Sequence, residues 1–313
     1  MIIRRGIGVV LTAVFIVLAV RNLEYSQLVG YLKNLSFPCL LASMSVFACS
    51  YFVRAWRWKI ASGPEITLPF LRFSKILMAG MLINEIFPAR AGDFYQAHRI
   101  SQTTSQRFAS ALAVRGIIRV FEGLTLTFLL VIALRLDPHC DTVFRALRIS
   151  TITVFSIAAL GVFFIAFTPE LSFRVASWLT RRFSNKAGET LAQAIRDFLA
   201  GLQVLKSPTR LARVLLLSFL HWGVEIVSFI LIFCALGVTW NVATPVLVLS
   251  AVCFACLLPS VPGGLGIFEY AVILALSTQG VTENQAFALA VVLHLSQLLV
   301  TASLGLYGWF KES

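Results

Sequence analysis

The sequence predicts an all-α, polytopic integral membrane helical bundle, and three observations carry that prediction. Of the 313 residues, 58% are hydrophobic and only 13% are charged, and the mean hydropathy is +0.87. A soluble domain carries about 25% charged residues, so this chain lacks the charge to cover a water-facing surface. Its apolar residues gather in runs of membrane-spanning length, and two further runs are interrupted by proline and glycine. The same composition excludes a disordered chain, a coiled coil and a secreted disulfide scaffold.

Six apolar runs are long enough to cross a bilayer, which takes about 20 residues, or somewhat fewer with polar flanks. The first run follows Arg4 and Arg5 and resembles a signal peptide. No small-x-small cleavage site follows it at Ala19-Val20-Arg21, so we interpret it as a helix. The predicted spans cover about 6–21, 36–54, 109–134, 149–168, 212–236 and 286–310.

Two further apolar stretches are predicted to form re-entrant hairpins, at about 68–108 and about 242–279. The first breaks at 88–93, Pro-Ala-Arg-Ala-Gly-Asp, and the second at 259–266, Pro-Ser-Val-Pro-Gly-Gly-Leu-Gly. Proline and glycine at this density end a helix. Because broken backbone at membrane depth is tolerated only inside protein or along a wet cavity, each break is expected to lie in such a place.

The basic residues predict the orientation of the chain in the membrane. If six helices cross, 19 of the 26 Lys and Arg residues lie on the side of the N-terminus and five on the other side, while Arg115 and Arg119 lie within a span. Basic residues gather in cytoplasmic loops. We therefore expect a multi-pass protein of the cell inner (cytoplasmic) membrane with both termini in the cytoplasm. The net charge of +12 then needs no nucleic-acid partner.

The predicted topology contains a possible inverted repeat, with 1–148 as the first transmembrane repeat and 149–313 as the second. Pro88 and Gly92 match Pro262 and Gly266 at an offset of 174. Inverted repeats with broken helices are typical of transporters, and a chance match of two Pro-x-x-x-Gly strings is the alternative. The basic segment 169–210 of the second half fits an amphipathic helix on the inner leaflet or an ordinary solvated loop.

Charged residues within the predicted membrane segments are the candidate functional residues, because such groups face a cavity or a partner. Arg115, Arg119 and Glu122 follow an i, i+4, i+7 spacing that places them on one helix face. At the hairpin breaks, free backbone N–H groups of new helix starts are expected to bind anionic oxygen. The alternative for each charged group is an ion pair that fixes packing. The candidate substrate-binding residues are Arg54, Arg57, Asn84, Arg90, Asp93, Arg115, Arg119, Glu122, Gly263, Gly264, Glu269 and His294.

Two other groups of polar residues favour a structural role. Residues 54–59, Arg-Ala-Trp-Arg-Trp-Lys, fit an interfacial anchor, with a grip on a lipid phosphate as the alternative. His221 and Glu225 are spaced i, i+4 on one helix and are expected to fix packing there.

Three motifs occur in order along nearly the whole chain. They are Arg54-Ala55-x-Arg57-Trp58, Asn84-x-x-x-Pro88-x-Arg90-x-Gly92-Asp93 and Pro262-Gly263-Gly264-Leu265-Gly266-x-x-Glu269. These motifs resemble the signatures of the lysylphosphatidylglycerol synthase transmembrane (flippase-like) family, and Arg119-x-x-Glu122 resembles its usual Arg-x-x-Asp. Ile118 and His294 depart from the Glu and Arg that the family commonly has. The resemblance implies lipid translocation by a stand-alone member without the aminoacyl-transfer domain.

The expected function is that of a lipid translocase, which moves an amphiphile with a phosphate or polar headgroup through a polar midplane cavity. Arg90, Arg119 and His294 are expected to contact the headgroup. The carboxylates of Asp93, Glu122 and Glu269 are expected to pair with the arginines in the empty site or to carry a coupling proton. The alternatives are an integral membrane transferase on a lipid-linked substrate and a non-catalytic membrane partner of an envelope-lipid enzyme.

The absence of a P-loop and of G-x-S-x-G and HExxH motifs favours a transporter over an enzyme, so no catalytic residue, cofactor or metal site is expected. The expected partners are an anionic or phosphate-bearing membrane lipid, envelope-lipid biosynthetic enzymes and further copies of the chain in a homo-oligomer.

Overall fold

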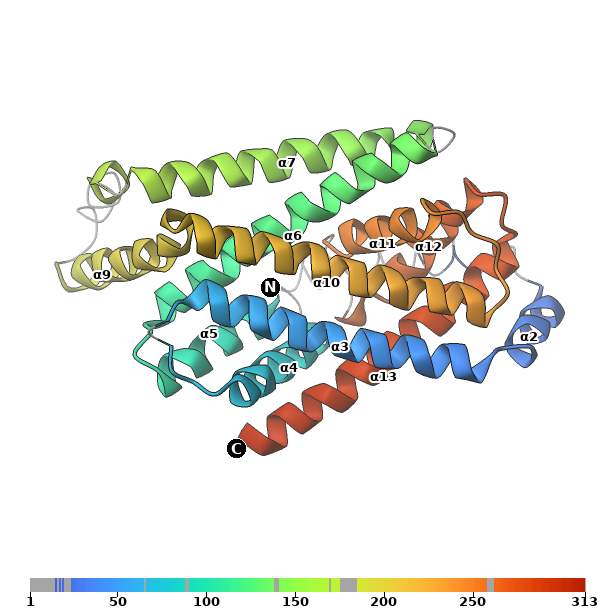
Figure 1. The fold of residues 1–313 in the computed structure, drawn as a ribbon, viewed down its shortest axis with the longest axis horizontal. Coiled ribbons are helices and arrows are strands. Elements are labelled where there is room, and N and C mark those ends of the chain that lie inside the picture. The colour runs from blue at the N-terminus through green and yellow to red at the C-terminus, as the bar shows by residue number, and fades with distance from the viewer. Residues whose placement is uncertain are drawn as a thin grey trace.

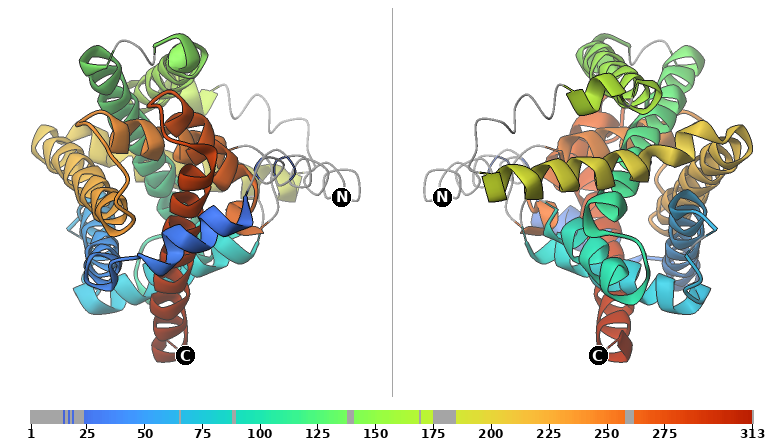
Figure 2. Two further views of the ribbon diagram at one scale, coloured as in Figure 1. Left: turned by 90° about the vertical axis from the view of Figure 1, so that its right-hand side faces the viewer. Right: turned by 90° about the vertical axis from the view of Figure 1, so that its left-hand side faces the viewer.

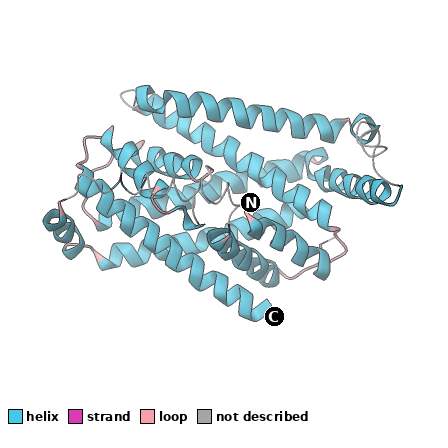
Figure 3. Ribbon diagram, turned by 180° about the vertical axis from the view of Figure 1, so that it is seen from behind, coloured by secondary structure: helices cyan, strands magenta, loops and turns pink. Residues whose placement is uncertain are grey.

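The computed structural model describes residues 15, 17, 19, 24–64, 66–87, 90–137, 141–168, 170–174, 185–257 and 262–312. Within these residues the regular structure is helical and contains no strand, which confirms the predicted all-α class (Figure 3). The predicted span at 6–21 lies outside the described residues apart from Phe15, Val17 and Ala19.

Five long apolar helices confirm the other predicted spans. Each has 26 to 30 residues, or about 39–45 Å at about 1.5 Å per residue, and so exceeds a hydrocarbon core of about 30 Å. These helices are longer than the apolar runs in the sequence, because a helix continues through polar flanking residues until a cap ends it. The five helices are α3 (Phe37–Ser62), α6 (Phe108–Leu136), α7 (Asp141–Phe167), α10 (Pro208–Ala235) and α13 (Glu283–Glu312).

The first predicted hairpin is present as α4 (Phe70–Ile86) and α5 (Ala91–Thr103), which pack against each other. The Asn84 Oδ1 atom accepts a 2.8 Å hydrogen bond from the backbone N–H of Gly92, which ties the end of α4 to the start of α5. The backbones approach so closely that a Cβ on Gly92 would lie 1.7 Å from the carbonyl oxygen of Gly80. The close packing of this hairpin therefore requires glycine at position 92.

Gly92→Ala is expected to destabilise the hairpin, because the added methyl group meets a backbone oxygen that cannot rotate away. Overpacking of this kind costs about 1–3 kcal/mol. Gly161→Ala in α7 is the matched control, since no described atom lies within 4 Å of a Cβ there and alanine favours a helix over glycine by about 0.5–1 kcal/mol. Thermal unfolding in detergent measures the difference, and an equal midpoint for both variants would contradict the close approach.

The second predicted hairpin is present as α11 (Thr244–Ala255) and α12 (Ile267–Ser277), with the 3₁₀ turn η3 (Pro262–Gly264) between them. The two helices have 12 and 11 residues, or about 17–18 Å, so neither crosses a bilayer alone. Before α12, three glycines have φ values of 73°, 67° and 82°, which glycine adopts without strain. They are Gly263, Gly264 and Gly266.

The basic segment 169–210 contains α9 (Asn185–Gly201) and η2 (Leu202–Lys206), while residues 175–184 lie outside the described part of the chain. Helix α9 packs against α6, and the exposed Arg107 bonds Asp197 at 3.0 Å. The helical interpretation is thus confirmed for 185–206, and its place on a leaflet remains a prediction. A further short helix, α2 (Tyr25–Lys33), precedes α3.

The helices enclose two hydrophobic cores, one among α6, α10, α11, α12 and α13 and the other mainly among α3, α4, α5 and α6. Helices α3 and α10 run side by side, and α4 packs along α13 (Figures 1 and 2). Helix α7 lies at the edge against α6 and exposes most of its side chains, as a lipid-facing helix does (Figure 1). The inverted relation of the two halves remains a prediction.

Candidate functional site

The arginines near the end of α3 point into the protein. Arg57 and Trp58 are 1% and 0% exposed, and the Arg54 side chain is 15% exposed. These positions share one helix face, while Trp56 on the other side is 53% exposed. The interfacial-anchor interpretation is therefore wrong for Arg54, Arg57 and Trp58. The physical reason is that this face of α3 packs against α10 and α6, where Glu225 and Glu122 neutralise the two arginines.

A continuous chain of ion pairs links α3, α5 and α6, and we call its five residues the ion-pair network. Asp93, in the first turn of α5, accepts hydrogen bonds from Arg115 at 2.6 Å and Arg119 at 3.1 Å. Arg119 also donates to Glu122 at 2.7 Å, and Glu122 accepts a second bond from Arg57. The shared face predicted for α6 is therefore confirmed, and its partners come from the first hairpin and from α3.

A second buried pair joins α3 to α10 beside the network. The Arg54 guanidinium donates to the Glu225 carboxylate, and its Nε atom also donates to His221 Nδ1 at 3.5 Å. Glu225 is absent from the sequence-based candidate set, which treats it as a packing partner of His221. The usable signal is a carboxylate within a membrane span, but the sequence does not show that α10 lies against α3.

Arg90 lies at the tip of the first hairpin, and its side chain forms no ion pair or hydrogen bond with the described residues. The residue is exposed. Its backbone has a φ of 54°, in the left-handed region that is uncommon for a residue other than glycine. It lies within electrostatic reach of Arg119, Asp93 and Glu122. A free cation therefore stands at the open side of the network.

Glu85, in the last turn of α4, lies between the first hairpin and the second. It is within electrostatic reach of Arg90, Arg54 and His294. With it, five guanidinium groups face four carboxylates in this part of the molecule. The surplus positive charge suits an anionic ligand.

Three of the backbone N–H groups at the two breaks, which were expected to be free, already have partners. The Asn84 Oδ1 atom accepts a hydrogen bond from the N–H of Gly92, and the Arg90 carbonyl oxygen accepts one from the N–H of Asp93 at 3.0 Å. In the second hairpin, the Glu269 Oε2 atom accepts from the N–H of Gly266 at 2.7 Å. Asn84 therefore holds the hairpin together.

His294 of α13 and Glu269 of α12 form a pair that holds one exchangeable proton. The His294 Nε2 atom lies 2.8 Å from the Gly263 carbonyl oxygen, which only accepts, so Nε2 carries a hydrogen. The Nδ1 atom lies 2.6 Å from Glu269 Oε1, so a further proton must sit on one of these two atoms. Glu269 thus pairs with a histidine and not with an arginine. Phe268 stacks on the imidazole, with ring centroids 4.1 Å apart.

The two glycines of the candidate set act through their backbone. Gly263 supplies the carbonyl oxygen that orients His294, and a Cβ on Gly264 would lie 3.3 Å from Cys256 Sγ. Both therefore fix the shape of the second hairpin. The charged candidate residues then form two groups. The first is the ion-pair network together with Arg54 and Arg90, and the second is the His294–Glu269 pair. Glu85 lies within electrostatic reach of both groups.

Comparison with known proteins gives relatives, among them two that are named as membrane proteins. The chain is 26% identical to glycosyltransferase AglD of Haloferax volcanii over 94% of its own length and 52% of that protein, so it spans about half of this relative. It is 25% identical to a UPF0104 membrane protein of Methanothermobacter thermautotrophicus, covering 80% of the chain and 78% of the relative. A UPF0104 membrane protein of Methanocaldococcus jannaschii is 28% identical, over 73% of the chain and 92% of the relative.

No solved structure matches the fold. The sequence profile of the lysylphosphatidylglycerol synthase TM region matches residues 6–305, which include both hairpins, the ion-pair network and the His294–Glu269 pair. The chain therefore belongs to the family of the lysylphosphatidylglycerol synthase transmembrane region.

Proposed function

We propose that the chain is a lipid translocase of the cytoplasmic membrane. It moves an amphiphile with a phosphate or similarly polar headgroup along a polar path between the two hairpins, while the tails stay in lipid. The observation that carries the proposal is the buried ion-pair network with the partner-free Arg90 beside it.

The cost of burying charge supports a functional role for the network. A charged residue at the centre of a membrane helix costs about 2.5–3.5 kcal/mol on insertion scales. Pairing offsets part of this penalty, yet buried ion pairs can often be replaced by apolar residues without loss of stability. The buried Nε atoms of Arg57 and Arg115 also lack a hydrogen-bond partner among the described residues. These two N–H groups are therefore able to donate hydrogen bonds to an oxygen of an anionic headgroup.

In the proposed cycle the headgroup meets Arg90 and then replaces a carboxylate on Arg119. Arg119 is the most exposed arginine of the network, with 27% of its side chain accessible. A guanidinium group binds phosphate through two parallel hydrogen bonds, as it binds a carboxylate. Asp93 and Glu122 pair with the arginines again when the headgroup leaves, so the arginines are never left unpaired.

The proton of the His294–Glu269 pair supplies a means of coupling. Because the sequence contains no P-loop, the proposed driving force is a proton gradient. Glu85 lies within electrostatic reach of both His294 and the arginines, and so connects the charge of the pair to the headgroup path. Release of the proton would leave an extra negative charge near the path and favour departure of an anionic headgroup.

Reconstitution of the pure protein in liposomes tests the proposal. Fluorescently labelled phosphatidylglycerol, phosphatidic acid and a polyprenyl phosphate are placed in the vesicles, and a membrane-impermeant quencher reports exposure over time. We expect faster exposure than in empty vesicles for at least one phosphate lipid. Equal rates for all three lipids, with and without a proton gradient, would overturn the proposal.

Arg90→Gln is expected to slow translocation by about tenfold with little change in stability, because Arg90 has no partner to lose and charge-assisted bonds to phosphate are worth about 1.5–3 kcal/mol. Arg135→Gln is the matched control, an exposed arginine at the far end of α6. The liposome assay and thermal unfolding are read together. An equal rate for both variants would remove Arg90 from the headgroup path.

A second candidate function is transfer of a group to or from a lipid-linked substrate. The observation that favours it is the name of one relative, glycosyltransferase AglD, of which the chain matches 52%. In that case Asp93 or Glu269 acts as general base. Product formation from a soluble sugar donor by the pure protein would support the transferase, and lipid exposure without a donor would support the translocase.

A further inference from the structure

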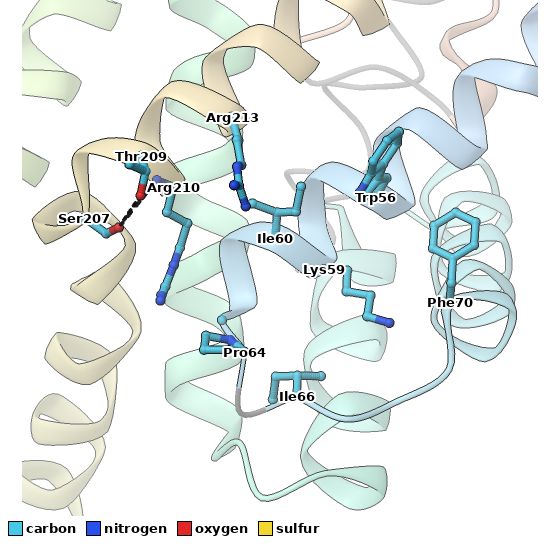
Figure 4. A pocket seen from close by; sticks show the side chains of 11 residues that line it. Trp56, Lys59, Ile60, Pro64, Ile66, Phe70, Ser207, Thr209, Arg210 and Arg213 are labelled. Atoms are coloured by element: carbon cyan, nitrogen blue, oxygen red, sulfur yellow. Dashed lines mark hydrogen bonds between the residues drawn. The ribbon is translucent and has the colours of Figure 1, made fainter.

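A basic cavity of about 730 Å³ lies where α3 ends and α10 begins (Figure 4). Arg210 and Arg213 project into it from α10, and Lys59 lines it from α3 (Figure 4). The apolar part of the lining includes Trp56 and Phe70. We call this space the α3–α10 cavity. It uses the outward face of α3, opposite the face that carries Arg54 and Arg57.

No carboxylate of the described residues lines the cavity beside its three cations. Lys59, Arg210 and Arg213 form no ion pair with the residues that the structure describes, whereas Arg54 and Arg57 on the other face of α3 each bind a carboxylate. Basic side chains gathered around one space without a carboxylate repel each other. An anion with several oxygens removes this repulsion and accepts their hydrogen bonds.

The apolar side of the cavity points to an amphiphile. Trp56 and Phe52, on the same outward side of α3, are 53% and 41% exposed. The ring centroids of Phe52 and Phe70 lie 6.4 Å apart. These aromatic side chains continue the cavity toward the surface that faces lipid in the predicted topology. A phosphate bound to the cations would thus leave its acyl chains against an apolar, outward-facing surface.

We propose that the α3–α10 cavity is a loading site for the phosphate group of an anionic lipid, taken from the leaflet at the α3–α10 end. This assignment rests on the proposed lipid translocation and adds a binding site distinct from the ion-pair network. The basic residues around 54–75 and 174–213 predict that this leaflet is the cytoplasmic one.

Quenching of Trp56 by lipids with brominated acyl chains tests the loading site. The protein is placed in nanodiscs of phosphatidylcholine, with brominated phosphatidic acid or brominated phosphatidylcholine as the minor lipid, and the Trp56→Phe variant isolates the signal of Trp56. We expect phosphatidic acid to quench Trp56 at a lower fraction than phosphatidylcholine. Equal quenching by the two lipids would overturn the proposal, because it indicates an ordinary lipid-facing surface.

Removal of two cations tests their role. Lys59→Gln/Arg213→Gln is expected to weaken the preference for phosphatidic acid about thirtyfold, from about fivefold for each basic residue near a lipid surface. Lys33→Gln/Arg135→Gln, at exposed sites outside the cavity, makes the same change in net charge and is the matched control. Equal effects of the two double variants would mean that the preference depends only on the net charge of the protein, and would overturn the assignment.

Inorganic phosphate separates a lipid site from a site for free phosphate. It is added to the nanodiscs as a competitor, and potassium chloride of equal ionic strength is the control. Relief of quenching only at the level that the salt produces supports the lipid assignment. Relief at much lower phosphate concentration would assign the cavity to free phosphate and overturn it.

The binding assay remains informative if translocation fails. Asp93→Asn, which alters the network on the other side of α3, is expected to stop translocation and to keep the lipid preference of Trp56 quenching. If the wild-type protein shows the preference but moves no lipid, the proposed function fails and the binding site stands. If it moves lipid without the preference, the loading site fails alone.

Discussion

Asp93→Asn is expected to abolish lipid translocation and to lower the free energy of unfolding by about 3 kcal/mol, the cost of breaking a buried ion pair by removing one partner. Asp93 neutralises both Arg115 and Arg119, at 2.6 Å and 3.1 Å. Asparagine has nearly the same shape but no charge, so Arg115 on α6 loses its carboxylate partner and Arg119 keeps only Glu122. The liposome assay measures the rate, and thermal unfolding measures the stability.

Asp197→Asn is the matched control for this change. Asp197 also pairs with an arginine, Arg107, but that arginine is 62% exposed. Exposed pairs contribute about 0–1 kcal/mol, so this variant is expected to keep both stability and rate. Similar losses in the two variants would contradict the special role of the buried site.

A double variant separates a packing role of Asp93 from a role in transport. In Asp93→Asn/Arg115→Met the more buried of the two arginine partners of Asp93 is removed together with the carboxylate, so stability is expected to recover relative to Asp93→Asn. Arg119 then has only Glu122, and not Asp93, to re-pair with it after headgroup release, so translocation is expected to stay low. Recovery of both stability and translocation would show that Asp93 only neutralises a buried charge.

The spans and hairpins were predictable because each depends on local sequence. An apolar run of about 20 residues must be buried in lipid, and dense proline and glycine must break a helix, wherever the rest of the chain lies. The ends of the helices were less predictable. Helix α3 runs to Ser62 rather than to residue 54, since hydrogen bonding along a helix continues past the apolar run. The burial of Arg54 and Arg57 was missed as well, because it depends on the packing of one face of α3 against α10 and α6.

The candidate site was predictable as a set of residue types but not as pairs. Polar residues in apolar spans identify Asp93, Arg119 and Glu122, because charges in a membrane need partners. Which partners they have depends on helix packing, and the chain does not encode in any local pattern that α10 lies against α3. The pairing of Glu225 with Arg54 was missed for this reason. The partners of the Gly92 and Gly266 N–H groups were also missed, because the side chains of Asn84 and Glu269 reach them only in the folded hairpins.

Glu269→Gln is expected to make translocation insensitive to a proton gradient while leaving the protein folded. Glutamine keeps an oxygen that accepts from the Gly266 N–H and an amide that donates to His294 Nδ1, so both hydrogen bonds of the carboxylate are retained. The pair then has no site from which a proton can move. Liposomes with a proton gradient imposed in either direction measure the response, which is expected to be at least about tenfold smaller than in the wild type if the lost coupling is worth about 1.4 kcal/mol.

Glu283→Gln is the control, with the same substitution at an exposed carboxylate in the first turn of α13, the helix that carries His294. It is expected to keep the full response to the gradient. A response to the gradient in Glu269→Gln equal to that of this control would exclude the pair as the coupling site.

His294→Arg extends the same reasoning, because the resemblance implies an arginine at this position. A guanidinium keeps the ion pair with Glu269 and can donate to the Gly263 carbonyl, but it does not release a proton. If the pair couples transport to protons, this variant is expected to translocate lipid at a rate that does not depend on the gradient. A gradient-dependent rate in His294→Arg would mean that the proton moves elsewhere, and Glu85, which lies within electrostatic reach of both His294 and Arg54, would then be the group to replace next.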